Sequence, residues 1–102
     1  MIKLVEVKKI TDFNVMERRA SAHFELDEIW LNPELILQIK SDQRMRTNLK
    51  KGFLPEKMDD RQQFSRVSFG TGNNVSVVTV VGSPETVAEK IYKFTSTEIL
   101  KG

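Results

Sequence analysis

The chain has 102 residues, and its 16 basic and 14 acidic residues give a formal net charge of +2 at pH 7. This length fits one domain, residues 1–102, and a hydrophobic content of 39% and a charged content of 29% are ordinary for a soluble globular protein. The sequence has no cysteine, no secretory signal and no apolar run of the roughly 20 residues that a membrane span needs. These features exclude disulfides, zinc ribbons and thiol nucleophiles, and we expect a cytoplasmic protein without a membrane partner.

The first third of the chain predicts two strands separated by a loop. Residues 2–7 (IKLVEV) favour a strand that is partly covered on both faces, because apolar and charged residues occur on each parity. Residues 11–20 have no clear period, and we interpret them as a loop at the tip of a wide hairpin. Residues 23–32 (HFELDEIWLN) favour a second, longer strand.

The second strand contains a conflict of parity. Phe24 and Leu26 share one face, whereas Ile29 and Leu31 fall on the other, so a regular strand cannot place both pairs in one core. A β-bulge near Asp27 and Glu28 would resolve the conflict, and so would burial of both faces by a partner subunit. The bulge is the preferred interpretation.

A helical insertion follows, at about residues 41–63. Asn32 and Pro33 are typical of a short helical turn, after which residues 37–41 resume a strand. The segment SDQRMRTNLKKG then has a Ser/Asp start, a Gly end and apolar residues four apart, which are helix signals. A polar loop completes the insertion, with apolar residues as expected anchors to the body: Phe53, Leu54 and Met58.

Two strands and a helix end the chain. FSRVSFG and VSVVTVVG are separated by TGNN, whose residues take positive φ at low cost, as in a tight hairpin turn. Valines on both faces of the second strand indicate a central strand. Ser83 and Pro84 are typical of a helix start. The whole pattern predicts an α+β fold: a single small antiparallel β-sheet of four to five strands with a short inserted helix and a C-terminal helix.

The glycines do not form a known phosphate-binding loop. Such a loop lies between a strand and a helix, whereas Gly70 and Gly72 precede a strand. Gly82 does precede a helix start, so free N–H groups near Ser83 could hold an anion. A capped helix packed on a sheet explains the same residues.

Metal binding and catalysis find little support in the sequence. His23, Glu25 and Asp27 share one face of a strand, but same-face neighbours are roughly 6.5–7 Å apart, too far for one ion. One histidine, no cysteine and serines without a visible base leave no nucleophilic arrangement. We expect no enzyme, no metal and no cofactor.

The basic residues are the more informative feature. Arg44, Arg46, Arg61 and Arg66 lie on or near the insertion, and guanidinium groups from different segments can clamp a phosphate bidentately. The alternative is a solvated helix face. Interleaved acidic residues argue against a broad nucleic-acid groove. Further basic residues bracket the first loop: Lys8, Lys9, Arg18 and Arg19.

Short motifs resemble two groups of small proteins. One is the flagellar FlbD-type group, on Leu31-Asn32, Leu35-Ile36, Ile39 and VVGSPETVAEKI. The other is a set of proteins encoded by tailed bacteriophages, which is similar over about residues 2–91. The second likeness includes the insertion, and its residues are Leu54-Pro55-Glu56, Asp59 to Gln62, Phe64 and Val80 to Pro84.

Some phage proteins of this size and build are anti-Thoeris-type proteins, which form homo-oligomers and sequester the nucleotide signals of host immunity. The resemblance therefore implies a non-catalytic phage protein in the host cytoplasm that sequesters a cyclic-nucleotide or ADP-ribose-type signal. Phe69 or Trp30 would offer a stacking face, although the core is the alternative place for both. The alternative function is a host-takeover protein that inhibits a host protein such as RNA polymerase or a nuclease. The expected ligand-binding residues are Arg44, Arg46, Arg61, Arg66, Phe69 and Ser83.

Overall fold

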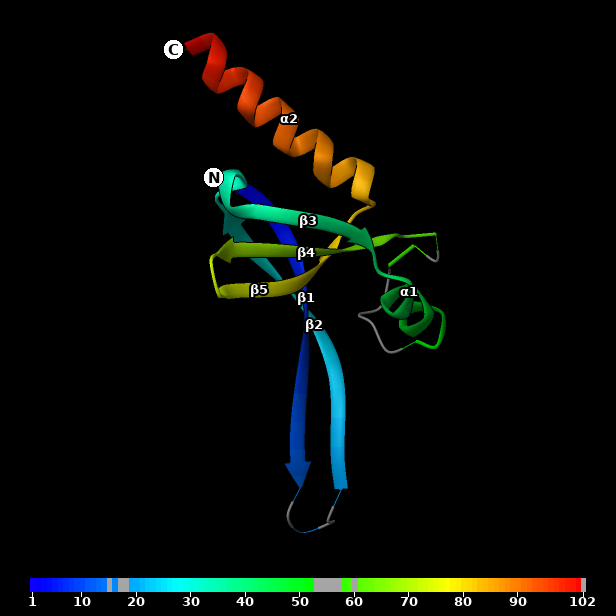
Figure 1. Ribbon diagram of the computed structural model, residues 1–102. Helices are drawn as coiled ribbons and strands as arrows, with labels where there is room; N and C mark the ends of the chain where they lie inside the picture. Colours follow the sequence, from blue (N-terminus) through cyan, green and yellow to red (C-terminus); the bar gives the residue numbers. More distant parts are fainter. Residues whose placement is uncertain (15, 17–18, 53–57, 60, 102) are drawn as a thin grey trace.

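The computed structural model describes residues 1–14, 16, 19–52, 58–59 and 61–101. These residues form one antiparallel sheet of five strands, in the order β2-β1-β5-β4-β3, with two α-helices beside it (Figure 1). The predicted α+β class is confirmed. The elements are β1 (Ile2–Asn14), β2 (Arg19–Leu31), η1 (Pro33–Leu35), β3 (Ile36–Ser41), α1 (Gln43–Lys50), β4 (Phe64–Thr71), β5 (Asn74–Val81) and α2 (Pro84–Lys101).

The first hairpin is much longer than the sequence predicted. β1 and β2 pair without interruption from Ile2–Leu31 to Asn14–Arg19. The predicted loop at residues 11–20 is therefore wrong for residues 11–14 and 19–20. Cross-strand backbone hydrogen bonds hold these residues in strands although the sequence has no amphipathic period there.

The distal half of this hairpin projects from the body as an arm (Figure 1). We define the arm as residues 10–14 of β1 and 19–23 of β2. The molecule measures 59 × 33 × 19 Å, and its radius of gyration is 16.0 Å, against about 13 Å for a compact chain of this length. The elongation follows from the arm.

The predicted bulge near Asp27 and Glu28 is also wrong, because the register of β1 and β2 is continuous there. Two hydrophobic clusters resolve the parity conflict instead. Ile29 and Leu31 pack against one cluster and Phe24 against the other. The irregularity in register lies in β3, between Ile36 and Gln38.

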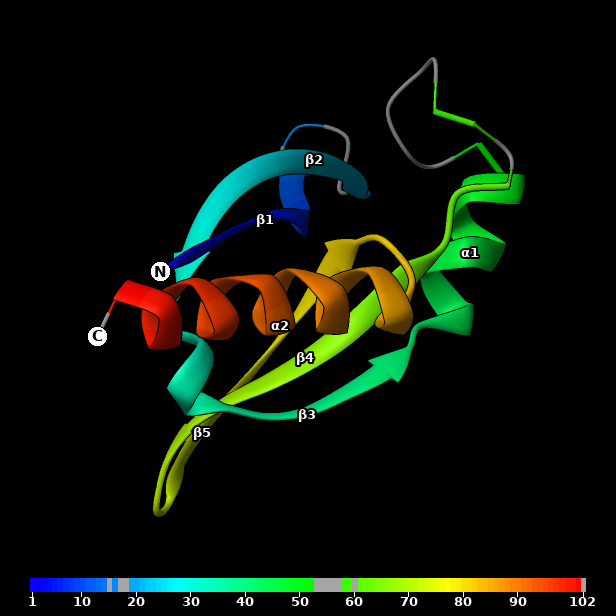
Figure 2. The ribbon, with the colours of Figure 1, turned by 90° about the horizontal axis from the view of Figure 1, so that it is seen from above.

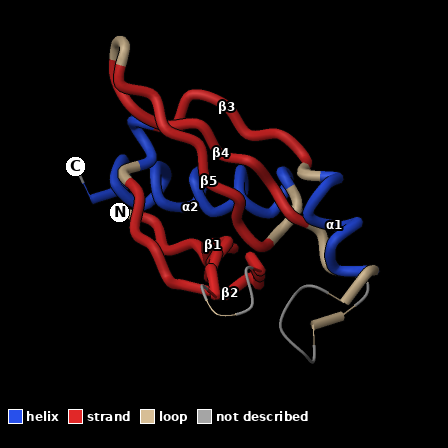
Figure 3. The backbone as a smooth tube through the Cα atoms, turned by 90° about the horizontal axis from the view of Figure 1, so that it is seen from below, coloured by secondary structure: helices blue, strands red, loops and turns tan. Residues whose placement is uncertain are grey.

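The two clusters lie on opposite faces of the sheet, because the consecutive residues Val80 and Val81 belong to different clusters. One cluster lies under α2, which crosses a face of the sheet (Figure 2). The other lies under α1, at one end of the sheet in the view from below (Figure 3). The first has as buried members Ile2, Leu4, Val67, Val80 and Val87, and the second has Val7, Met45, Leu49 and Phe64.

Local caps begin the helices where the sequence predicted them. The Asn32 side chain accepts from the backbone N–H of Glu34 at 3.1 Å, at the start of η1. The Ser83 hydroxyl accepts from the backbone N–H of Thr86 at 3.1 Å, at the start of α2. These bonds satisfy N–H groups that have no partner within their helix.

Asp42 joins the insertion to the sheet. Its Oδ1 accepts from the backbone N–H of Met45 at 3.0 Å and so caps α1. Its Oδ2 accepts from the Thr79 hydroxyl of β5 at 2.8 Å. Because Asp42 is buried, with 8% of its surface exposed, both bonds replace water that the carboxylate has lost. Of the three expected anchors, Met58 packs against the cluster under α1, while Phe53 and Leu54 lie outside the described residues.

The turn between β4 and β5 is the predicted hairpin, and its glycines differ in what they require. Gly72 has φ +56° with open space where a Cβ would stand. Gly70 has φ +135°, and a Cβ there would lie 2.0 Å from the backbone oxygen of Asn74. Position 70 therefore requires glycine for two reasons: a Cβ would clash with the backbone of Asn74, and the positive φ disfavours other residues.

We predict that Gly70→Ala lowers the free energy of unfolding more than Gly72→Ala. Gly72→Ala should cost about 1 kcal/mol, the penalty of the left-handed region for an L residue. Gly70→Ala must in addition displace the backbone at Asn74. Urea unfolding checks both, with Gly72→Asn as a control that tolerates positive φ; equal losses at the two glycines would contradict the prediction.

We also predict that Asp42→Ala destabilises the protein by about 1–2 kcal/mol, since it removes a helix cap and the partner of a half-buried hydroxyl. Asp42→Asn keeps one acceptor and should cost less. Thermal unfolding of both variants, with Thr79→Val as the variant that removes only the second bond, separates the two contributions. An Asp42→Ala variant as stable as the unmodified protein would refute the assignment.

Candidate functional site

A groove lies between α1 and the sheet face that α1 partly covers. Its volume is about 580 Å³, within the range of small-molecule sites, roughly 300–1,000 Å³. Residues from all five strands and from α1 and its N-cap contribute to its wall. The lining residues are Lys9, Phe24, Ser41, Asp42, Gln43, Arg44, Met45, Asn48, Arg66 and Thr79.

Three basic side chains from three different elements line this groove: Lys9 of β1, Arg44 of α1 and Arg66 of β4. Among the described residues none of the three forms an ion pair, whereas Lys3 and Lys8 pair with acidic residues across the hairpin at 3.8 Å. The structure thus brings together two of the predicted arginines, Arg44 and Arg66. It adds Lys9, which the sequence placed only beside a loop.

Asp42 is the one acidic residue of the groove wall. Its two oxygens accept hydrogen bonds from Met45 and Thr79, so it is held by neutral donors and not by the groove's cations. Three cations and one carboxylate leave the lining with two net positive charges. A dianion is the complementary partner for such a surface.

Phe24 supplies the aromatic surface of the groove. It lines the groove while packing, half-buried, against the cluster under α1. The predicted stacking residues lie elsewhere. Phe69 has the opposite parity to Arg66 on a strand of regular register, so it faces the other side of the sheet. Trp30 is 60% exposed, with Lys3 Nζ 6.0 Å from its ring centroid.

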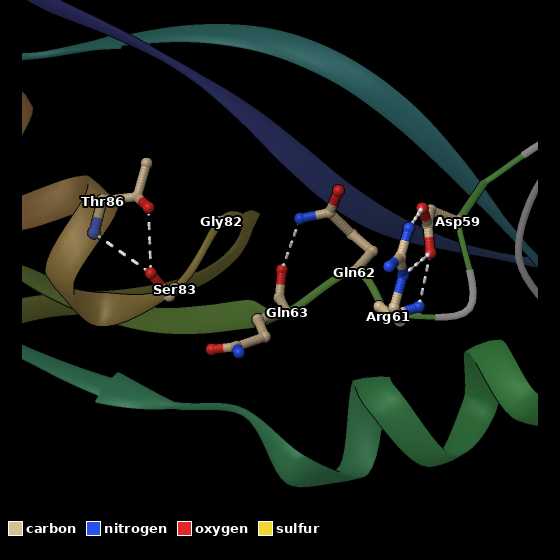
Figure 4. A pocket seen from close by; sticks show the side chains of 7 residues that line it. All are labelled: Asp59, Arg61, Gln62, Gln63, Gly82, Ser83 and Thr86. Carbon is tan, nitrogen blue, oxygen red and sulfur yellow. Dashed lines mark hydrogen bonds and ion pairs between the residues drawn. The ribbon is translucent and has the colours of Figure 1, made fainter.

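Arg61 and Ser83 line a separate hollow of about 520 Å³ near the start of α2 (Figure 4). Arg61 donates from Nη2 to Asp59 Oδ2 at 3.1 Å and from Nε to Oδ1 at 3.2 Å. The Ser83 hydroxyl is bonded to Thr86, at the backbone N–H and at Oγ1. Figure 4 shows the Arg61 guanidinium directed toward Asp59 and the Ser83 hydroxyl directed toward Thr86, so each side chain already has a partner within the protein.

Arg46, the remaining predicted arginine, lines neither hollow. It is half-buried on α1, and its Nε is buried without a hydrogen-bond partner in the part of the chain that the structure describes. An unsatisfied buried donor is costly. Arg46 is not part of the groove.

The structure offers no metal site among the residues that it describes, where no group of three or more His, Asp or Glu side chains gathers. His23, Glu25 and Asp27 were the residues considered as metal ligands on β2. Of these, His23 Nε2 lies 3.0 Å from Glu25 Oε1. The described helices include none with the length and hydrophobicity to cross a membrane. The absence of catalysis stays a prediction.

The Arg61 side-chain hydrogen bonds, followed by the Arg61 backbone N–H, hold the pKa of Asp59 below its ordinary value. The same pairing raises the pKa of Arg61. A lowered carboxyl pKa contributes stability that is present above the unfolded pKa and is lost as the pH falls through the folded value.

We predict that Arg61→Ala returns the pKa of Asp59 toward its ordinary value. An NMR titration of the Asp59 carboxyl carbon checks this, and an unchanged midpoint would contradict it.

Known proteins add no assignment for these residues. No protein-family model, no curated protein and no solved structure matches the chain.

Proposed function

We propose that the protein is a non-catalytic binding protein that holds a phosphorylated small molecule in the groove between α1 and the sheet. The observation that carries the proposal is the convergence of Lys9, Arg44 and Arg66 on one groove without ion-pair partners among the described residues. Exposed cations usually lower their energy by pairing or by spreading over the surface. Three from separate elements at one groove favour a bound anion.

The chemistry of the groove suits a nucleotide. Arg44 and Arg66 can each donate two parallel hydrogen bonds to a phosphate, and Lys9 adds a compact charge. Phe24 offers an apolar face for a base, and base–aromatic stacking is worth about 1–3 kcal/mol. The Thr79 hydroxyl donates to Asp42, so its lone pairs remain to accept from a ligand hydroxyl or amine.

A small anion fits better than a nucleic-acid strand. A polyanion needs a basic track that follows many phosphates. Here the acidic residues Glu25 and Asp27 are exposed on β2 close to Phe24 in sequence. Three cations meet at one groove and form no long basic track, which supports a ligand with few charges.

Together with the resemblance to small phage proteins, the groove supports a phage-encoded, homo-oligomeric protein in the host cytoplasm. It would sequester a cyclic-nucleotide or ADP-ribose-type immune signal without turnover or cofactor. The second candidate is a host-takeover protein that binds a host protein through the insertion. The basic, exposed side of that segment favours this candidate through Arg44, Lys50 and Lys51.

We predict that Arg66→Ala weakens binding of such a nucleotide at least tenfold, because one charge-assisted hydrogen bond is worth roughly 1.5–3 kcal/mol. The melting temperature should change little, since Arg66 is exposed on β4. Calorimetry against a panel of cyclic and ADP-ribose-type nucleotides measures the affinity. Arg61→Ala is the matched control, because it removes an exposed arginine that lines the other hollow.

The outcomes separate the candidates. An equal loss in Arg61→Ala and Arg66→Ala would reject the groove as the site. If the unmodified protein binds no nucleotide at millimolar concentration, the sequestering function is rejected and the host-protein candidate is favoured. Recovery of altered nucleotide after incubation would reject the non-catalytic part of the proposal.

A further inference from the structure

The two free edges of the sheet are built differently. The β3 edge is six residues long, its register breaks between Ile36 and Gln38, and it carries Lys40. Short length, irregularity and lysine are features that protect an edge strand from pairing with another chain. The β2 edge is 13 residues long, is regular throughout and contains no proline, glycine or lysine.

The arm gains nothing from the rest of the fold. None of its side chains that the structure describes belongs to either hydrophobic cluster, and Phe13 is 63% exposed. A two-stranded ribbon is only marginally stable in water, and three or more strands are needed for independent stability. Added strands would therefore stabilise the arm.

We propose that these strands come from a second copy of the chain, paired antiparallel along the β2 edge. β2 is the terminal strand of the sheet, and in Figure 2 it forms the outer margin with no helix along its outer side. An isologous contact between two copies uses the same strand twice and closes as a dimer. Two five-stranded sheets then become one continuous sheet, and β2 of each arm gains a partner strand on its open edge.

Charge selects the register of this contact. A two-fold pairing centred on Phe24 places His23 opposite the partner's Glu25 in both directions and Ala22 opposite the partner's Leu26. Centring on Glu25 would face two carboxylates with each other, and centring on Leu26 would face Glu25 with the partner's Asp27. Like charges directly opposite each other destabilise a sheet, so the register centred on Phe24 is favoured.

A register centred on His23 is the remaining close competitor. It would face two imidazoles with each other and leave Glu25 opposite the partner's Ser21, without an opposite charge. It would also place Leu26 opposite an alanine two residues farther out on the arm. The register centred on Phe24 pairs aromatic with aromatic, and such cross-strand pairs are among the more stabilising ones.

The dimer would complete the candidate site. Phe24 lines the groove, so the partner's Phe24 would extend the apolar wall on which a base can stack. The β2–β2 interface would define how the homo-oligomer of the proposed function assembles, and the inference rests on the homo-oligomeric part of that proposal. Assembly and nucleotide binding are separate measurements, so the failure of one is distinguishable from the failure of the other.

Sedimentation at micromolar concentration tests the assembly, since one chain has a mass of 11.7 kDa. We expect twice that mass, and we expect Ala22→Lys to raise the dimer dissociation constant at least tenfold by placing a charge at the pairing edge. Thr11→Lys is the matched control, because Thr11 faces Ala22 across the hairpin on β1, away from the β2 edge. A single-chain mass for the unmodified protein, or an assembly that Ala22→Lys leaves intact, would overturn the interface.

Disulfide formation tests the register, because the chain has no cysteine of its own. His23→Cys and Glu25→Cys replace two exposed side chains. A mixture of the two variants should form a mixed disulfide dimer under mild oxidation, and neither variant alone should form one. Efficient crosslinking of either variant by itself would overturn the register centred on Phe24.

Discussion

The position of the insertion depends on one buried carboxylate. Asp42 begins α1 through the N–H of Met45 and holds the helix to β5 through the hydroxyl of Thr79. The backbone N–H of Asp42 also donates to the Phe64 carbonyl of β4 at 2.8 Å, and Met45 and Leu49 pack in the cluster under the helix. The groove wall contains Asp42, Thr79 and the first turn of α1, so the same contact that anchors the helix also shapes the candidate site.

The sequence predicted the features that depend on neighbouring residues. The caps at Asn32, Asp42 and Ser83 and the turn at Gly72 involve partners within a few positions, and residue type alone identifies such partners. The length of the first hairpin was missed, because its register depends on pairing across a turn. No hydrophobic period accompanies that pairing.

The candidate site was predictable only in part, for a related reason. Arg44 and Arg66 are separated by the loop of the insertion, and their basic character was visible in the sequence. Lys9 and Phe24 join them because the hairpin continues past Val7 and carries both side chains to the groove. Arg61 was indistinguishable from Arg66 in the sequence, and only the geometry shows that Asp59 already compensates its charge.

The single bridge between Glu6 and Val80 divides the sheet into two units. On one side, β1 and β2 pair with each other as a hairpin; on the other, β3, β4 and β5 pair in sequence order. Each unit can form from contacts that are nearer in sequence, whereas the bridge joins two residues 74 positions apart, Glu6 and Val80. Because closing a long loop costs conformational entropy before its contacts form, we expect the junction of β1 with β5 to assemble last. It would also be the boundary at which the protein opens first.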